Sequence, residues 1–378
     1  MFGIGIIAPL MSIYAKTLGA SNFDIGIIFG SFAIARTVAQ IPVGTLSDIF
    51  GKKIFIVLGT LLCSIATLMY AYVHSVIELL IVRTLNGAFS SFITPVAGAY
   101  IATIAPKNKL GEYMGLFSSS IGMGFATGPL IGGVLAKWFG IRSPFYFCSA
   151  LAFIAFVLSY IKLKNVRVNN EGRCEYVNKN ILYEKVSTKN KFSLEYITKS
   201  FLIAYGINTT YMSINTGIMV YLAVYATKYG VGLDLVGFLI AFTNLVMGLL
   251  QRRFGRIYDK IGMSIVYGGL LTSSIGLYLL SLSHTFIMML ISLTLVSIGG
   301  AMFGPGINAL AMSDVPNNKK GSAMGLFTTS LNIGMFLGAV FLGYVADMVG
   351  LSKMYQFSSI LIVAVLIIVV FLTIRKNK

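Results

Sequence analysis

Charged residues are scarce in this chain of 378 residues: Asp, Glu, Lys and Arg make up 11% of it, whereas 57% is hydrophobic. In soluble domains about a quarter of the residues are charged. The chain also lacks the alternating segments of about ten residues that build a transmembrane barrel. It has instead apolar runs of about 20 residues, which cross the hydrocarbon core of a bilayer as helices. The composition therefore predicts an all-α polytopic membrane protein.

Residues that carry chemistry are also sparse. Of three cysteines, Cys63 and Cys148 fall in apolar runs and Cys174 in a basic segment, a placement that indicates neither a disulfide framework nor a metal site. The sequence shows no His/Cys/Asp/Glu cluster, no nucleotide-binding Gly-Lys-Ser/Thr loop and no nucleophile–base pair. We therefore expect no metal, no cofactor and no enzymatic activity.

Acidic residues are outnumbered, since 29 Lys and Arg stand against 12 Asp and Glu, for a net charge of +17. Of the 29 basic residues, 22 fall in alternate loops on one side of the predicted spans and five on the other, while Arg36 and Arg83 lie inside apolar runs. Lys and Arg concentrate in cytoplasmic loops of membrane proteins. Orientation thus explains the charge without a nucleic-acid partner. It predicts a multi-pass protein of the cell membrane with its central linker and C-terminus in the cytoplasm.

The apolar runs predict about twelve helices. They cover residues 2–16, 23–43, 54–73, 77–103, 113–136, 143–163, 199–225, 232–251, 262–282, 285–312, 321–345 and 354–374. The first is too short to span a membrane, and we expect it to be the second half of a truncated helix 1 that begins upstream of Met1. Residues 164–198, rich in Lys, Asn and Glu, are expected to form a cytoplasmic linker. The predicted domains are an N-terminal six-helix bundle (1–163), the linker (164–198) and a C-terminal six-helix bundle (199–378).

The two predicted bundles repeat each other. Pro95 recurs as Pro305, and residues 111–117 recur as 321–327, each 210 residues later. Six helices separate each pair, so the copies keep the same orientation in the membrane. This pattern is typical of two parallel halves related by an axis along the membrane normal.

A polar, glycine-punctuated stretch separates the second and third apolar runs, Gly44-Thr-Leu-Ser-Asp-Ile-Phe-Gly-Lys-Lys53, and it predicts a charged turn between two spans. A weaker copy in the second half contains Gly255, Asp259 and Gly262.

The stretch resembles the signature loop between helices 2 and 3 of the major facilitator superfamily of transporters, Gly-x-Leu-x-Asp-x-x-Gly-Arg/Lys-Lys/Arg. The matching positions are Gly44, Leu46, Asp48, Gly51, Lys52 and Lys53, while Ile49 stands where a basic residue is common. Residues 79–87 look like the family's helix-4 motif with its buried arginine, here Arg83, and Asn86 replaces the usual Gln. The resemblance covers essentially the whole chain and implies the major facilitator fold, two pseudo-symmetric six-helix bundles.

A third motif resembles the helix-5 motif of the family's exporters, chiefly drug:proton antiporters. Its residues are Gly124, Gly128, Pro129, Gly132 and Gly133. Small residues four apart let helix backbones approach closely in lipid, and a proline tends to kink a helix. The motif is therefore either simple tight packing or a rigid, bent contact between the halves that seals one face of a cavity.

The resemblance implies that Asp48 is a latch that holds the halves together in one state and releases them in the other. Lys52 and Lys53 are equally well explained as topology-setting charges. Arg83 is expected to face a cavity or a partner, because a charge inside the membrane is costly; the alternative is that it snorkels to the outer headgroups. The same alternatives apply to Arg36.

None of the twelve acids is predicted deep in a span. Glu78, Asp24 and Asp234, near the outer helix ends, are the candidates for proton coupling. Some relatives in the resembled family carry the coupling acid in helix 1, so the mechanism of coupling stays open.

By the same resemblance, helices 1, 4, 7 and 10 line a substrate cavity. Their aromatic, methionine and amide side chains suit lipophilic or amphipathic molecules. The candidates are Met11, Tyr14, Phe89, Phe92, Tyr205, Asn208, Tyr211, Asn215, Met302, Phe303 and Asn308.

We therefore expect a monomeric secondary active transporter that exports small lipophilic molecules in exchange for protons by alternating access. One alternative is an uptake or sugar/metabolite carrier of the same fold, against which the helix-5 motif argues. Another is a non-transporting membrane receptor or scaffold.

Overall fold

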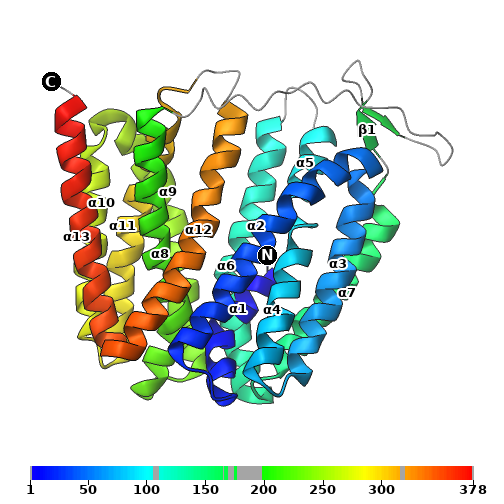
Figure 1. Ribbon diagram of the computed structural model, residues 1–378, viewed down its shortest axis with the longest axis horizontal. Coiled ribbons are helices and arrows are strands. Elements are labelled where there is room, and N and C mark those ends of the chain that lie inside the picture. Colours follow the sequence, from blue (N-terminus) through cyan, green and yellow to red (C-terminus); the bar gives the residue numbers. More distant parts are fainter. Residues whose placement is uncertain are drawn as a thin grey trace.

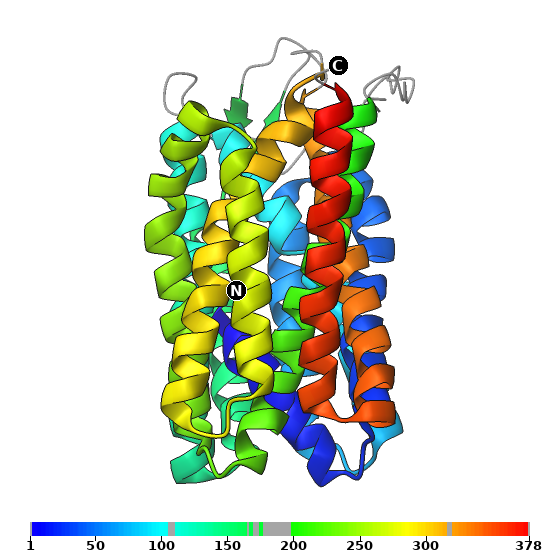
Figure 2. The ribbon, with the colours of Figure 1, turned by 90° about the vertical axis from the view of Figure 1, so that its left-hand side faces the viewer.

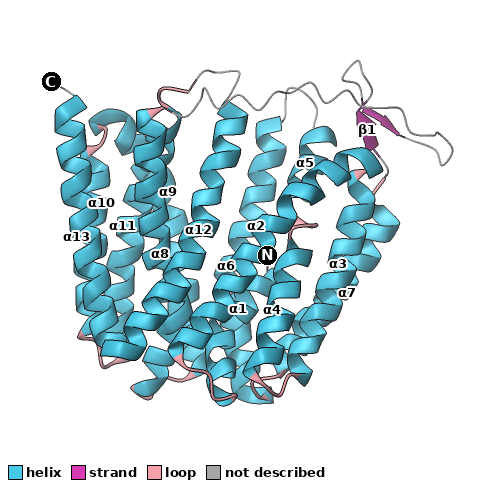
Figure 3. Ribbon diagram, in the orientation of Figure 1, coloured by secondary structure: helices cyan, strands magenta, loops and turns pink. Residues whose placement is uncertain are grey.

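The structure of the protein is a computed structural model that describes residues 2–104, 110–164, 166–168, 174–176, 198–315 and 320–376. Nearly all of them are helical, and the helices run between two faces where the connecting turns gather (Figures 1 and 3). In chain order the helices are α1 (Phe2–Thr17), α2 (Asn22–Phe50), α3 (Lys52–Met69), the 3-10 helix η1 (Tyr70–Tyr72), α4 (Val76–Ser90), α5 (Thr94–Ile104), α6 (Leu110–Phe139), α7 (Ser143–Lys162), α8 (Lys199–Lys228), α9 (Leu233–Ile261), α10 (Ser264–Ser281), α11 (Phe286–Met312), α12 (Lys320–Val349) and α13 (Leu351–Lys376).

The expected all-α membrane fold is confirmed. Within the ranges given above, nine helical segments are long and apolar enough to cross a membrane. Two short strands that the sequence analysis did not predict, β1 (Val166–Val168) and β2 (Cys174–Tyr176), pair antiparallel after α7 (Figure 3). We call the face that carries them the linker face, and the opposite one, where α1 ends and α2 begins, the closed face.

The charged turn predicted from Gly44 to Lys53 is wrong, because α2 stays helical to Phe50 and α3 begins at Lys52. Only Gly51 breaks the helix, with φ of 95°, a left-handed conformation that glycine adopts without steric cost. The second-half copy behaves alike: α9 runs to Ile261 and Gly262 has φ of 62°. Each stretch is thus a sharp corner between two helices.

The single helix predicted over 77–103 is also wrong, since α4 ends at Ser90 and α5 begins at Thr94. Pro95 follows directly, and a proline removes a helical hydrogen bond and its ring clashes with the preceding turn. Its copy Pro305 lies inside the uninterrupted α11. The sequence repeat does not preserve this break.

In contrast, the sequence repeat is matched by a repeat in the packing of the helices. Ser64 of α3 and Ser149 of α7 each donate a hydrogen bond to the other's carbonyl oxygen, both at 2.9 Å. Ser274 of α10 and Ser359 of α13, their copies 210 residues later, do the same at 3.1 and 2.9 Å. Equivalent helix pairs are therefore joined by equivalent hydrogen bonds.

The helices before and after the linker meet mainly where α2 packs against α12, α6 against α9, and α1 against α8 (Figures 1 and 2), and α2 also touches α8. The division into domains at residues 163 and 199 stays a prediction. For brevity we call α1–α7 and α8–α13 the two halves.

The halves meet at the closed face and diverge towards the linker face. Of the described hydrogen bonds between them, the one farthest from the closed face is donated by the Asn244 amide of α9 to the carbonyl oxygen of Phe125 of α6, at 3.2 Å. Beyond that level, Gly44 of α2, Gly122 of α6 and Gly248 of α9 have open space where a side chain would be. Among the described residues, the hydrogen bonds that join the halves therefore all lie between the closed face and the level of Asn244.

Candidate functional site

Arg83 lies in the N-terminal half, with its guanidinium over aromatic rings. Its Cζ is 4.4 Å from the centre of the Phe32 ring and 5.1 Å from that of Phe29, both on α2. The residue is only 4% exposed, and its Nε has no hydrogen-bond partner. Gly87, one helical turn on, allows this approach, because any side chain there would meet the Phe32 carbonyl oxygen. A cation held against ring faces is stabilised by their negative electrostatic potential. Arg83 is therefore buried between helices and does not snorkel to the surface.

Further polar groups continue along the same helices. Asn86 of α4 donates to the hydroxyl of Thr67 of α3 at 3.4 Å. Arg36 of α2 is half-buried, and its Nε, like the hydroxyl of Tyr70, has no hydrogen-bond partner. These residues make the interior of the N-terminal half polar and cationic.

The three candidate coupling acids lie at helix N-termini on the closed face. Asp24 accepts from the backbone N–H and the hydroxyl of Ser21, in a capping box. Glu78 accepts from the backbone N–H of His74 at 2.9 Å. Asp234 pairs with Lys137 of α6 at 2.8 Å. Within the described ranges none of them forms an ion pair with Arg83.

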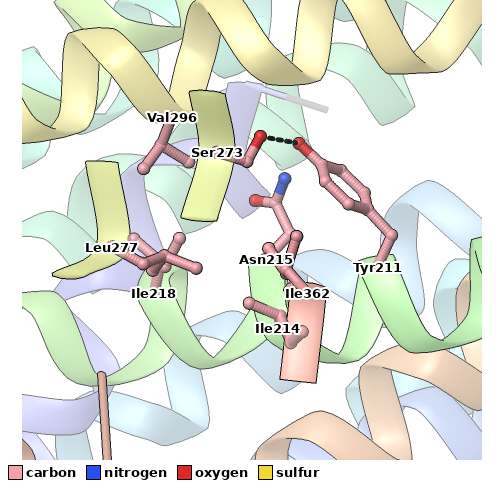
Figure 4. Close-up of a pocket in the computed structure, with 8 residues that line it drawn as sticks. All are labelled: Tyr211, Ile214, Asn215, Ile218, Ser273, Leu277, Val296 and Ile362. Carbon is pink, nitrogen blue, oxygen red and sulfur yellow. Dashed lines mark hydrogen bonds between the residues drawn. The ribbon is translucent and has the colours of Figure 1, made fainter. Parts of the chain in front are cut away.

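In the C-terminal half, several cavity candidates gather around Ser273 of α10 (Figure 4). The hydroxyls of Tyr211 and Ser273 are 3.4 Å apart, and the Asn215 amide lies beside them. Phe303 is fully buried and stacks on Tyr211, with ring centres 4.1 Å apart. Unlike the cluster around Arg83, this one carries no charge.

Two further candidates for the substrate cavity, Tyr205 and Asn208, form hydrogen bonds with α12. Tyr205 and Thr329 share a hydrogen bond of 2.8 Å, and the Asn208 amide donates to Ser330 at 2.7 Å. Of the remaining candidates, Met11 and Tyr14 are buried, Phe89, Phe92 and Met302 are half-buried, and Asn308 is exposed. Tyr14 donates to the carbonyl oxygen of Val73 at 3.0 Å, so it belongs to the packing of the closed face.

The helix-5 motif lies on α6 and has two different neighbours. A side chain at Gly5 of α1 would lie 2.7 Å from the carbonyl oxygen of Gly124 and 3.5 Å from the Cα of Gly128, and one at Gly132 would meet the carbonyl oxygen of Ile6. The stripe of small residues thus packs within the N-terminal half. The contact with the other half is made by two further residues, Pro129 and Gly133.

Gly133 and Pro129 touch α9 at the closed face. A side chain at Gly133 would come within 2.5 Å of the carbonyl oxygen of Leu233, and one at Gly237 would collide with the carbonyl oxygen of Pro129. Lys137 and Asp234 form their ion pair beside this contact, with side chains 51% and 27% exposed. We call these residues the α6–α9 seam.

The matching contact of the repeat joins α2 to α12. A side chain at Gly26 would collide with the carbonyl oxygen of Ala339, and one at Gly343 would lie 2.7 Å from the carbonyl oxygen of Asn22. Gly343 stands 210 residues after Gly133, and Ala339 stands 210 residues after Pro129. We call this contact the α2–α12 seam.

Polar residues of the α2–α12 seam were missed from the sequence. Asp347 accepts hydrogen bonds from the backbone N–H groups of Asn22 and Phe23 and from the Asn22 amide, at 3.0, 2.7 and 2.7 Å. The Tyr221 hydroxyl donates to the carbonyl oxygens of Asn22 and Ala339, at 3.0 and 2.6 Å. The repeat offset could have signalled Asp347, which is the counterpart of Lys137.

The signature residues lie at the linker face. Leu46 is 40% exposed, and the ammonium of Lys53 lies 5.9 Å from the centre of the Tyr160 ring. The side chains of Asp48 and Asp259 fall outside the described part, so the predicted latch cannot be placed. Gly255 packs near Pro305 of α11.

The arrangement suits binding and conformational change more than covalent chemistry. In the part of the chain that the structure describes, no three His, Cys, Asp or Glu residues could hold a metal ion together. The described groups instead form two polar clusters within the halves and two seams between them.

Comparison with known proteins agrees with this arrangement. The family model of the Major Facilitator Superfamily matches residues 1–339. An uncharacterized MFS-type transporter of Methanocaldococcus jannaschii is 52% identical over 369 residues, which are 97% of this chain and 94% of the relative. The quinolone resistance protein NorA of Staphylococcus aureus is 26% identical over 370 residues, 97% of this chain and 92% of the relative.

Solved structures with the same fold are more distant in sequence. A bacterial homologue of the human lysosomal transporter Spinster, in an inward-facing and occupied conformation, superposes with a TM-score of 0.79 at 15% identity, covering 98% of this chain and 91% of that one. The nucleoside transporter NupG superposes with a TM-score of 0.79 at 12% identity, covering 100% and 96%.

Proposed function

Because this chain belongs to the Major Facilitator Superfamily of membrane transporters, we propose that it exports small lipophilic or amphipathic molecules in exchange for protons. The chain is a multi-pass membrane transporter and not an enzyme.

The position of the helix-5 motif carries this proposal. Its residues Pro129 and Gly133 lie where α6 meets α9, and its glycines pack α6 tightly on α1. A motif that resembles that of exporters therefore forms part of the contact that closes one face. The relationship to a quinolone resistance protein, at 26% identity, supports export of an amphipathic compound.

The proposed cycle is alternating access. Substrate would enter from the linker face, and the closed face would part to release it. We propose that the linker face is cytoplasmic, since it carries most of the basic residues, and that the protein works in the cell membrane as a monomer. Asp48 would then latch the cytoplasmic ends in the opposite state, and Arg83 would stabilise the polar interior near the substrate.

Accumulation of a fluorescent amphipathic dye in cells that express the protein tests export. Cells with an intact proton gradient are expected to contain less dye than control cells, and a protonophore is expected to raise their content to the control level. A protonophore that instead lowers the dye content would show uptake and contradict the proposal.

Variants distinguish a transporter from a receptor or scaffold on the same fold. Asp48→Asn and Arg83→Ala are expected to abolish the protonophore-sensitive difference at equal expression. Lys353→Ala, at an exposed position of the closed face, serves as the matched control and is expected to leave it unchanged. If Asp48→Asn and Arg83→Ala both keep the difference, their proposed roles are wrong.

A further inference from the structure

We propose that Asp347 and Tyr221 hold Asn22, the first residue of α2, by hydrogen bonds between the halves. We call this group of interactions the clasp, and we propose that it sets the equilibrium between the state in which the halves meet at the closed face and the state in which they part there. Asp347 and Tyr221 are positioning residues of the transport cycle, and the inference rests on the proposed alternating access. It requires neither export nor proton coupling.

Asn22 is held from both sides by the C-terminal half. Its backbone N–H and its side-chain amide donate to Asp347 of α12, at 3.0 and 2.7 Å. Its carbonyl oxygen accepts from the hydroxyl of Tyr221 of α8, at 3.0 Å. Since all three groups belong to one residue, parting the halves breaks these bonds together.

Asp347 completes the cap of α2. A helix begins with four N–H groups that have no partner inside it. Here the N–H of Ser21 donates to the Asp24 carboxylate, and the N–H of Asp24 donates to the Ser21 hydroxyl. The N–H groups of Asn22 and Phe23 are left, and Asp347 from the other half accepts both. The capping box within α2 thus leaves two N–H groups without an acceptor from their own helix. Asp347 supplies that acceptor only when the halves meet at the closed face.

The charge of Asp347 adds to the hydrogen bonds. A carboxylate near a helix N-terminus is stabilised by the positive end of the helix dipole, and hydrogen bonds to an ionised acceptor are stronger than neutral ones. Tyr221 supplies a rigid support, because it is buried and its hydroxyl also contacts the carbonyl oxygen of Ala339 of α12. Lys16 of α1 interacts electrostatically with Asp347 and extends the cluster to a third helix.

The equivalent place in the other seam is built differently. Lys137, the counterpart of Asp347, pairs with the side chain of Asp234, and both side chains are partly exposed. Two flexible side chains in water gain little from such a pair. Asp347 is exposed as well, but it binds backbone groups whose positions the helix fixes. The clasp therefore contributes more to closure than the ion pair does.

Distance measurements between spin labels test the proposal with the full chain in lipid nanodiscs. Cysteines at His74 and Lys353, exposed on the closed face of the two halves, report its opening. Cysteines at Lys162 and Lys260 report the linker face. The background carries serine in place of Cys63, Cys148 and Cys174. The matched variants are Asp347→Asn and Lys137→Gln, which each remove one charge from equivalent positions.

Asp347→Asn is expected to raise the ratio of open to closed distances at the closed face about five- to tenfold, in line with the loss of a helix cap, and to shorten distances at the linker face. Lys137→Gln is expected to change the ratio less than about threefold. Tyr221→Phe, which removes one hydroxyl, should shift it in the same direction as Asp347→Asn. If Asp347→Asn and Tyr221→Phe leave the distances unchanged, or shift them no more than Lys137→Gln does, the clasp is refuted. A protein that imports its substrate but shows these shifts would refute the proposed export and leave the clasp standing.

Discussion

The α2–α12 and α6–α9 seams share one backbone design and differ in their polar groups. In both, glycines bring one helix against the carbonyl oxygens of the other: Gly26 and Gly343 in the first, Gly237 and Gly133 in the second. In addition, the first seam has a carboxylate that accepts hydrogen bonds from backbone N–H groups at a helix N-terminus, and the second has an ion pair between two side chains. The repeat thus supplies the close contact, and a few residues outside it decide how strongly each seam holds.

The largest effect is expected from adding a side chain at a glycine of the α2–α12 seam, where the two helix backbones are in contact. Gly343→Ala places a methyl group 2.7 Å from the carbonyl oxygen of Asn22 and against the Tyr221 hydroxyl. Because backbone cannot move aside as a side chain can, we expect the closed face to open and transport to fall at least about tenfold, as for an overpacked core. Initial rates of dye transport in proteoliposomes measure this.

Gly122→Ala provides the control, since Gly122 of α6 faces open space. It is expected to transport at the normal rate. Transport by Gly343→Ala at the rate of Gly122→Ala would show that the seam does not need this close approach.

An intermediate effect is expected at the buried hydroxyl of the clasp. Tyr221→Phe removes the donor to Asn22 and Ala339 while keeping the ring. The loss of one such hydrogen bond costs about 1 kcal/mol, roughly a fivefold change in an equilibrium. The open-to-closed ratio of the spin-label pair on the closed face measures it. Tyr344→Phe, which alters an exposed ring on α12, is expected to leave this ratio unchanged. An equal shift in both variants would show that the Tyr221 hydroxyl has no special role.

The smallest effect is expected from the α6–α9 ion pair. Asp234→Asn should change the ratio of open to closed distances less than about threefold, and still less at high salt, because exposed charges are screened. The reversed pair, Lys137→Asp with Asp234→Lys, should restore the ratio of open to closed distances only in part, because it places each charge at the helix end that disfavours it. A change in this ratio from Asp234→Asn as large as that from Asp347→Asn would show that the two seams contribute equally to closure.

Much of the fold could be predicted from the sequence, because apolar runs and the 210-residue repeat depend on local composition. The helices and the repeat follow from them, whereas the sequence left open whether Arg83 is buried or reaches the outer headgroups. The corner at Gly51 and the break before Pro95 were missed, since one residue decides each and an apolar pattern runs through both. Helix ends are the part of such a fold that an apolar pattern specifies least.

The clasp could not be predicted in the same way. Asp347 is one of the twelve acids, and nothing near it in the sequence suggests a partner 325 residues away. Which charges meet across the halves depends on how α2 crosses α12, and helix periodicity does not contain that angle. Likewise, Phe29 and Phe32 were ordinary apolar residues until the structure placed them against Arg83.

The central claim is that the closed face must part at the α2–α12 seam in every transport cycle. Cysteines in place of Phe23 and Tyr344, whose rings are 6.3 Å apart across the seam, can be joined by a short bifunctional thiosulfonate reagent. Transport in proteoliposomes is expected to stop when the reagent is added and to return with a reductant, while each single-cysteine variant stays active throughout. Transport at the full rate by the cross-linked double variant would contradict the claim.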